Sequence, residues 1–127
     1  MQTYERKTPE DLDCGIIVFM KVLGGKWKPC IVDLIYNGIT RPSEMHRQLP
    51  SATPRVIDMQ LRELELHGLV CKTIQPGFPL RADYTLTKMG RDIMPIVTAM
   101  DIWGRNNGEY VKEVTQTTIP NKFSVTE

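Results

Sequence analysis

The sequence lacks the features that mark membrane, secreted and disulfide-stabilised proteins. Its longest uninterrupted apolar run, Ile16 to Met20, is far shorter than the roughly 20 residues that a membrane-spanning helix needs. The N-terminal segment MQTYERKTPEDLD is charged and has no apolar core, so we do not expect a signal peptide. The three cysteines are odd in number and form no Cys-x-x-Cys pair, which argues against a disulfide framework. These absences favour a cytoplasmic protein that does not bind a membrane.

The sequence also lacks a recognisable catalytic or metal-binding constellation. The only histidines, His46 and His67, are far apart, and no third ligand accompanies a pairing of His67 with Cys71. The segment Gly24-Gly25-Lys26 is missing the further glycine and the Ser/Thr of a phosphate-binding loop. An enzyme that uses Cys14 as a nucleophile ranks last, because no histidine lies near it in sequence. We therefore expect no enzyme, no cofactor and no metal.

Length and charge indicate one domain that meets a polyanion. A chain of 127 residues with 41% hydrophobic residues fits a single globular domain and excludes disorder of the whole chain. The net charge of +1 is unevenly divided. Residues 21–91 carry eleven basic against six acidic side chains, which gives +5, whereas residues 1–20 (two against four) and 92–127 (three against five) each give −2. A basic centre between acidic ends suits a core that binds nucleic acid.

The first predicted helix is apolar on more than one face. Leu12, Ile16, Phe19, Met20 and Leu23 recur at helical spacing, and Gly24-Gly25 ends the run. Ile17, Val18 and Val22 lie off that stripe and are also apolar. A helix of this kind must be buried on two sides, so we expect its second face to meet another subunit.

A second helix is expected from about Lys26 to Tyr36. Pro29 falls in its first turn, where a missing N–H is tolerated, and Asn37-Gly38 ends it. Trp27 and Cys30 are assigned to its buried side, where Cys30 would be inert core.

The next segment predicts two helices joined by a tight turn. A short helix over Pro42–Gln48 buries Met45 and is followed by the turn Leu49–Ala52. Thr53 is a preferred N-cap and Pro54 suits the first position of the following helix. That helix ends at His67-Gly68, and its buried stripe comprises Ile57, Leu61 and Leu64.

A hairpin and a long last helix complete the chain. Leu69–Ile74 and Ala82–Leu86 read as strands joined by a proline-containing tip, residues 75–81. Thr87 caps the last helix, and Pro95 inside it predicts a kink.

The predicted order of elements defines the fold class. Two helices joined by a tight turn and followed directly by a hairpin describe a winged helix-turn-helix, mainly α with a small β-hairpin. We expect residues 1–127 to form one such domain, with a core at about 12–111 and a loosely ordered tail at 115–127. The first and last helices are expected to make a homodimer.

Several motifs stand in a fixed order along the chain: Cys14, Gly24-Gly25-Lys26-Trp27, Leu61-Arg62-Glu63-Leu64-Glu65, His67-Gly68-Leu69-Val70, Pro79 to Thr87, Gly90 and Trp103-Gly104. Over about residues 12–108, this set resembles the HxlR-type bacterial transcriptional regulators, which are relatives of the MarR-type winged helices. The chain departs from the family pattern at Gly15, Pro42 and Leu80, where members usually have proline, an aromatic residue and a second proline. The resemblance implies binding of double-stranded DNA.

The helix that follows the tight turn carries the predicted base-reading residues. At 100° per residue, Arg55, Met59 and Arg62 share the face opposite the buried stripe. Arginine can donate two hydrogen bonds to guanine in the major groove. Thr53 and Arg55 lie at the end that enters the groove, whereas Arg62 is further back and suits a phosphate. The alternative is that these side chains are merely solvated.

Four other residues are DNA-binding candidates. The resemblance places the wing arginine at Arg81, where the alternative is an ion pair with Asp83 or another acid. Lys26, near the start of the second helix, is either a phosphate contact or an exposed lysine. Arg41 and Ser43, beside the third helix, are phosphate candidates.

Cys14 has two interpretations. It is either a small apolar residue of the first helix or a redox or electrophile sensor, because it matches the cysteine that serves as a sensor in several members of the family. A sensing thiol needs a lowered pKa and some access to solvent. The start of a helix favours a thiolate, whereas Asp11 and Asp13 oppose it.

The sequence thus predicts a homodimeric, sequence-specific DNA-binding regulator on a two-fold symmetric operator, with an oxidant or small electrophile as its effector if Cys14 is a sensor. The alternative is a winged-helix module that binds protein and not DNA. The +5 charge of the central segment argues against that alternative.

Overall fold

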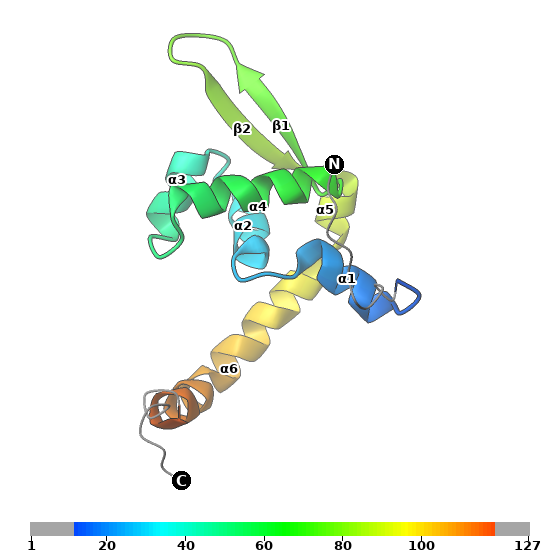
Figure 1. Cartoon of the computed structure of the whole chain (residues 1–127), viewed down its shortest axis with the longest axis vertical. Helices are drawn as coiled ribbons and strands as arrows, with labels where there is room; N and C mark the ends of the chain where they lie inside the picture. Colours follow the sequence, from blue (N-terminus) through cyan, green and yellow to red (C-terminus); the bar gives the residue numbers. More distant parts are fainter. Residues whose placement is uncertain (1–11, 119–127) are drawn as a thin grey trace, which may run out of the picture. The chain divides into compact units, whose positions relative to one another are not determined.

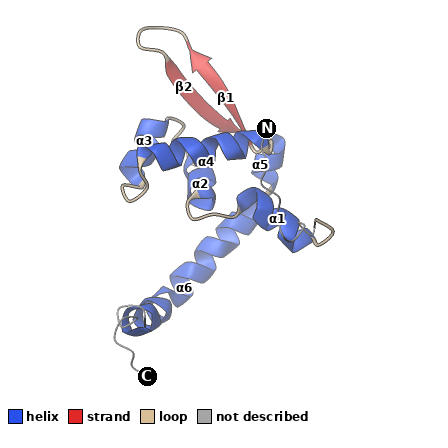
Figure 2. Ribbon diagram, viewed as in Figure 1, coloured by secondary structure: helices blue, strands red, loops and turns tan. Residues whose placement is uncertain are grey.

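The computed structural model describes residues 12–118 (Figure 1). Six helices and one antiparallel hairpin follow one another in this part of the chain: α1 (Gly15–Leu23), α2 (Lys28–Tyr36), α3 (Pro42–Gln48), α4 (Pro54–Leu66), β1 (Val70–Gln75), β2 (Arg81–Leu86), α5 (Lys88–Asp92) and α6 (Met94–Thr118). This order confirms the mainly helical, winged helix-turn-helix fold (Figure 2). The chain forms two compact units that divide between Asp92 and Ile93. The first holds α1 to α5 with the hairpin, and the second holds α6.

Helix α4 is the central element of the first unit, and its local signals act as predicted. The hydroxyl of Thr53 accepts a hydrogen bond from the backbone N–H of Val56 at 3.2 Å, which caps the helix. Ile57, Leu61 and Leu64 are fully buried. Gly68 follows the helix with a φ of +82°, a conformation that glycine adopts without steric penalty. The predicted stripe and both ends of this helix are confirmed.

The pairing of α3 with α4 forms the helix-turn-helix. The bounds of α3 agree with the prediction, and Met45 is fully buried. Residues 49–53 make the turn, in which the N–H of Ala52 donates to the Leu49 carbonyl. Figure 1 shows α3 at the N-terminal end of α4 and the hairpin leaving its C-terminal end. Helix α3 and the hairpin therefore lie at opposite ends of α4.

The hairpin pairs in a single register from Val70 opposite Leu86 to Gln75 opposite Arg81. The strands lie within one residue of the predicted bounds. The N–H of Tyr84 also donates to the Thr40 carbonyl at 2.9 Å. This bond attaches the segment before α3 to β2.

Two predictions for α2 are wrong: the place of Trp27 on the buried side of the helix and the burial of Cys30. The helix begins at Lys28, so Trp27 is its half-buried N-cap. Cys30 is exposed, because the buried face consists of Lys28, Ile31, Val32 and Ile35. The predicted stripe is rotated by about one residue toward Cys30, because apolar residues lie on several sides of this helix and do not by themselves define which side meets the core.

The predicted kinked last helix is two helices. Thr87 precedes α5, and a turn at Ile93 separates α5 from α6. Pro95 therefore stands in the first turn of α6, where its missing N–H breaks no helical hydrogen bond. Residues 115–118, which were expected in the tail, are helical, and residues 119–127 lie outside the described residues.

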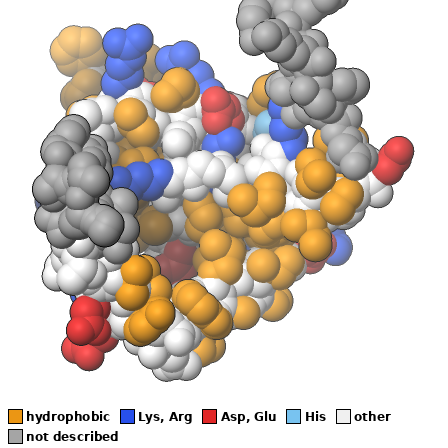
Figure 3. Space-filling model, turned by 60° about the horizontal axis from the view of Figure 1, so that its bottom comes forward, with side chains coloured by type: hydrophobic (Ala, Val, Ile, Leu, Met, Phe, Trp, Pro, Cys, Tyr) orange, Lys and Arg blue, Asp and Glu red, His pale blue; other side chains and the backbone are white. Residues whose placement is uncertain are grey.

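Most of the apolar side chains of α1 are exposed. Leu23 is buried, whereas Ile16, Ile17, Val18 and Met20 are not. On α6, Met94 and Val97 are buried, and a further set of apolar side chains is exposed: Ile96, Met100, Ile102, Trp103, Tyr110, Val111 and Val114. Figure 3 shows exposed hydrophobic side chains in orange. Within residues 12–118, no helix is long and apolar enough to cross a bilayer.

Candidate nucleic-acid interface

The outer face of α4 presents the predicted reading residues to solvent. Arg55, Met59 and Arg62 are all exposed, and Thr53 is exposed at the N-cap. These side chains lie opposite the buried stripe, so α4 is fixed by its inner face and free on its outer one. An exposed helix face of this kind, preceded by a tight turn, has the geometry that enters a major groove.

The C-terminal half of the same face lies near the hairpin. The phenol of Tyr84 on β2 is buried, and burial raises its pKa above the usual value. The carboxylates of Glu65 and Asp58 raise this pKa further, whereas Arg62 lowers it. Arg62 therefore lies within electrostatic range of Tyr84, and its assignment as a phosphate contact stays a prediction.

An ion pair between α2 and α4 helps to fix the orientation of α4. The Nζ of Lys28 lies 2.7 Å from a carboxylate oxygen of Glu63, and the Lys28 side chain is only 7% exposed, compared with 48% for Glu63. A buried ammonium group requires such a partner. Lys28 is not among the residues predicted from the sequence. The available signal was its spacing from Ile31, Val32 and Ile35, which places it on the buried face of α2.

The candidates beside α3 are exposed or half-buried. Arg41 is the N-cap of α3, but its side chain makes no capping hydrogen bond. Its Nε lies 3.9 Å from Oδ1 of Asp83 on β2. Ser43 is exposed in the first turn of α3. Arg41 therefore lies beside β2, whereas the turn that leads into α4 begins at the other end of α3.

Arg81 is the first residue of β2 and lies beside Asp83. Its Nε lies 3.6 Å from Oδ2 of Asp83, which is the ion pair considered as the alternative to DNA contact. Half of the Arg81 side chain nevertheless remains exposed. Asp83 thus brings together two predicted DNA contacts, Arg41 and Arg81, from separate segments.

Lys26 and Cys14 lie apart from the helix-turn-helix in sequence and belong to other segments. The Nζ of Lys26, in the loop between α1 and α2, is 5.0 Å from the centre of the Trp27 ring, so it makes a cation–π contact. Cys14 is the half-buried N-cap of α1, and its side chain makes no capping bond. Cys30 and Cys71 are both more exposed than Cys14.

Within residues 12–118, no three His, Cys, Asp or Glu side chains are grouped closely enough to hold a metal ion. The described surface around α4 presents exposed or half-buried arginines together with the hydroxyls of Thr53 and Ser43, which are groups that can contact phosphates and bases.

Comparison with protein families agrees with this geometry. Residues 22–112 match the model of the HxlR-like helix-turn-helix family. The chain belongs to this family. Its members among the matched proteins are transcriptional regulators of the helix-turn-helix type. The regulator YybR of Bacillus subtilis is 36% identical over 104 residues, which are 82% of this chain and 83% of that protein. A helix-turn-helix regulator of Methanothermobacter thermautotrophicus is 36% identical over 97 residues, 76% of this chain and 74% of that one.

Among solved structures, this HxlR-like chain is similar to the redox regulator HypR. The oxidised form is 38% identical with a TM-score of 0.70, and the match covers 74% of this chain and 97% of that one. The reduced form is 35% identical with a TM-score of 0.73, over 79% and 99% of the two chains. These likenesses extend over most of the described residues and support the family assignment and the fold.

Proposed function

We propose that this HxlR-like regulator binds DNA sequence-specifically, as a homodimer on a two-fold symmetric operator. The observation that carries the proposal is the set of exposed or half-exposed arginines that three elements of one unit present around α4. Arg55 and Arg62 belong to α4, Arg41 to the start of α3 and Arg81 to the start of β2. Such a surface supplies electrostatic affinity for a polyanion, and the family of regulators makes DNA that polyanion.

In this proposal each element has its own role. The N-terminal half of α4, with Thr53, Arg55 and Met59, reads base edges in the major groove. Arg62, Arg41 and Ser43 contact phosphates beside it, Arg81 on the wing contacts a phosphate or the minor groove, and Lys26 is a further phosphate candidate.

Replacing Arg55 is expected to relax sequence preference, whereas replacing Arg81 weakens binding to all sequences alike. A duplex selected from a random pool by the parent protein serves as the specific probe, and an unselected duplex as the non-specific one. Arg55→Ala should remove about 1–3 kcal/mol of discrimination between them, since it removes a base contact. Arg81→Ala should lower both affinities similarly and reduce the salt dependence by about one counterion per protomer. Fluorescence anisotropy at several salt concentrations measures both effects.

Arg105→Ala, on α6, is the control for loss of one positive charge outside this surface. It should leave the discrimination unchanged. If both test variants bind the two duplexes as the parent does, the assignments on α4 and the wing are wrong. If the parent shows no salt-dependent binding to any duplex, the alternative of a protein-binding winged helix is favoured.

The homodimer is supported by apolar side chains that the described chain leaves exposed on α1 and α6. On α6, Ile96, Met100, Trp103, Tyr110 and Val114 follow one another with Asn107 at alternating spacings of four and three residues. This heptad spacing keeps one stripe of a helix facing a partner helix. A second copy of the chain is the partner that a two-fold operator requires, because it places two α4 helices about one DNA turn, roughly 34–36 Å, apart.

A response to electrophiles through Cys14 is the second part of the proposal. Two observations support it: the likeness to HypR, which is named a redox regulator, and the position of Cys14 at the start of α1, a helix with exposed apolar side chains. A quinone adds to the cysteine sulfur, and the thiol proton passes to the ring oxygen, so the adduct needs no further oxidant. Bulk added beside a subunit contact changes how two copies sit, and with it the spacing of the two α4 helices.

Treatment with benzoquinone is expected to change the affinity of the parent for selected DNA by about tenfold or more, which corresponds to a coupling free energy within the usual 1–3 kcal/mol. Cys14→Ser should abolish that change. Cys30→Ser and Cys71→Ser are matched controls and should retain it, although both thiols are more exposed than Cys14. Mass mapping of the adducts accompanies the titration. Equal responses of the parent and Cys14→Ser would reduce Cys14 to a packing residue.

A further inference from the structure

The strongest unassigned feature is the side-chain cluster around Asp83. Its side chain is only 17% exposed, although it lies on a hairpin strand. One oxygen, Oδ1, accepts a hydrogen bond from the Thr40 hydroxyl at 3.0 Å and lies 3.9 Å from Nε of Arg41. The other oxygen, Oδ2, lies 3.6 Å from Nε of Arg81. A single carboxylate therefore meets three side chains from two separate segments.

The backbone fixes the same junction. The N–H of Tyr84, the residue after Asp83, donates to the carbonyl of Thr40 at 2.9 Å. The segment before α3 is thus held against β2 both by its main chain and by its side chains. These contacts fix the position of Asp83 relative to α3 independently of the two arginines.

The two arginines keep donors for another partner. The contacts to Asp83 involve Nε of each guanidinium, at distances typical of loose ion pairs rather than of short hydrogen bonds. The guanidinium group carries five N–H donors in a planar fork. Since 40% of the Arg41 side chain and 50% of the Arg81 side chain are exposed, each can meet a phosphate while it remains beside the carboxylate.

We infer that Asp83 is a positioning residue, which holds the Arg41 and Arg81 guanidinium groups in a fixed relative placement for two backbone phosphates of a specifically bound duplex. This inference rests on the proposed DNA-binding function. A carboxylate in a phosphate-binding surface repels DNA, so its charge alone lowers affinity for every sequence. Its advantage arises only in the specific complex, where the protein occupies one register and each phosphate has one position.

A positioning role therefore predicts that Asp83→Asn changes two quantities in opposite directions: the affinity for unselected DNA rises, and the ratio of specific to non-specific affinity falls. The amide oxygen of asparagine can still accept from Thr40, so the junction is retained while the charge is lost. Affinity for an unselected duplex should rise about two- to threefold, because one negative charge per protomer is removed. The ratio of specific to non-specific affinity should fall about tenfold. The released arginines still attract any duplex but no longer meet the two phosphates of the specific register, whereas Arg81→Ala removes the contact from both complexes alike. Anisotropy titrations with the selected and unselected duplexes measure both quantities.

Three further proteins isolate the positioning role. Asp92 is an exposed acid on α5 that pairs with Lys88. Asp92→Asn is therefore the charge control and should leave the affinity ratio unchanged. Thr40→Val keeps every charge but removes the hydroxyl that holds Oδ1, so it should lower the ratio without raising non-specific affinity. In a variant with both Arg41→Ala and Arg81→Ala, adding Asp83→Asn should no longer change the ratio.

The outcomes separate this inference from the proposed function. If the parent discriminates between the duplexes and Asp83→Asn keeps the parent ratio, Asp83 is not a positioning residue. A fall of both affinities in parallel with a lower melting temperature would give Asp83 a structural role only and would also overturn the inference. If the parent itself fails to distinguish the two duplexes, the proposed function is overturned, and the inference is overturned with it.

Discussion

Gly90→Ala is expected to destabilise the first unit by about 3 kcal/mol, because overpacking against rigid backbone has no low-energy escape. A Cβ atom built on Gly90 would lie well inside van der Waals contact with the carbonyl oxygen of Leu69 and would press on the Leu86 side chain. The Leu69 oxygen cannot move freely, since it accepts a hydrogen bond from the N–H of Thr87 at 3.0 Å. Urea or thermal unfolding followed by circular dichroism measures the loss.

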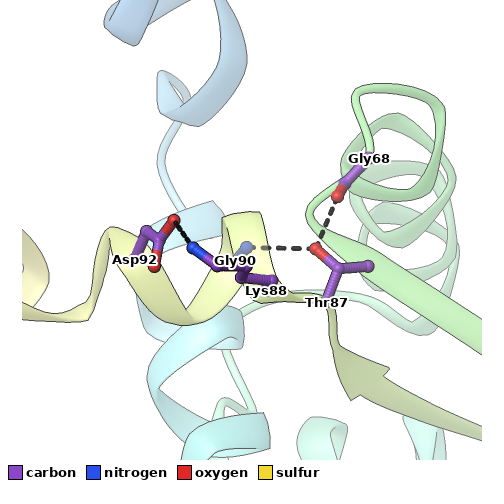
Figure 4. A network of polar contacts seen from close by, with 5 residues as sticks. All are labelled: Gly68, Thr87, Lys88, Gly90 and Asp92. Atoms are coloured by element: carbon purple, nitrogen blue, oxygen red, sulfur yellow. Dashed lines mark hydrogen bonds and ion pairs between the residues drawn. The ribbon is translucent and has the colours of Figure 1, made fainter.

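The network around Thr87 explains why this junction is rigid (Figure 4). The Thr87 hydroxyl donates to the Gly68 carbonyl at 2.6 Å and accepts from the N–H of Gly90 at 3.1 Å. It therefore caps α5 and at the same time ties α5 to the end of α4. Any shift that accommodates a methyl group at Gly90 disturbs these bonds.

Gly108→Ala is the matched control, because Gly108 is also helical and a Cβ there meets no heavy atom within 4 Å. This variant should gain stability by about 0.5–1 kcal/mol, the usual advantage of alanine over glycine inside a helix. A Gly90→Ala protein as stable as the parent would show that the contact between α5 and Leu69 gives way easily. The junction would then not hold α5 rigidly against the end of α4.

The parts of the fold that depend on local signals were predictable from the sequence. Thr53 and Pro54 mark the start of α4 through capping and a preset φ, and Ile57, Leu61 and Leu64 mark its buried face through spacing alone. The motif order then implied the wing, and with it the approximate place of Arg81. Arg55 was found in the same way, since its exposure follows from the direction of the stripe opposite to it.

The parts that depend on tertiary contacts were not predictable. Cys30 lies on a stretch whose residues are apolar on several sides, so only packing against α4 and β2 decides that it faces solvent. Glu63, the partner of Lys28, is 35 residues away in sequence, and two partners of Asp83, Thr40 and Arg41, are 43 and 42 residues away. No local pattern couples such positions. The break before α6 was also missed, because a proline inside a helical pattern is compatible both with a kink and with a new first turn.

Trp103→Glu is expected to raise the dissociation constant of the proposed homodimer by about 100-fold or more. Trp103 belongs to the heptad-spaced stripe of α6, and 62% of its side chain is exposed in the single chain. If a second copy covers this stripe, the variant must bury an unpaired carboxylate there, which costs several kcal/mol. Sedimentation velocity over a range of protein concentrations measures the dissociation constant directly. The same variant should bind a duplex with one half-site as the parent does, but lose the additional affinity for two half-sites, because that gain depends on the linked pair of α4 helices.

Ile102→Glu provides the control for this face of α6. Ile102 is the neighbouring residue and is similarly exposed at 54%, but it falls outside the heptad-spaced stripe. The same charge introduced there stays in solvent, so the dimer should persist and the affinity for two half-sites should change little. If Ile102→Glu dissociates the dimer and Trp103→Glu does not, the partner covers a different face of α6. A parent protein that sediments as a monomer at micromolar concentration would contradict the homodimer altogether, and the regulator would then have to recognise a single half-site.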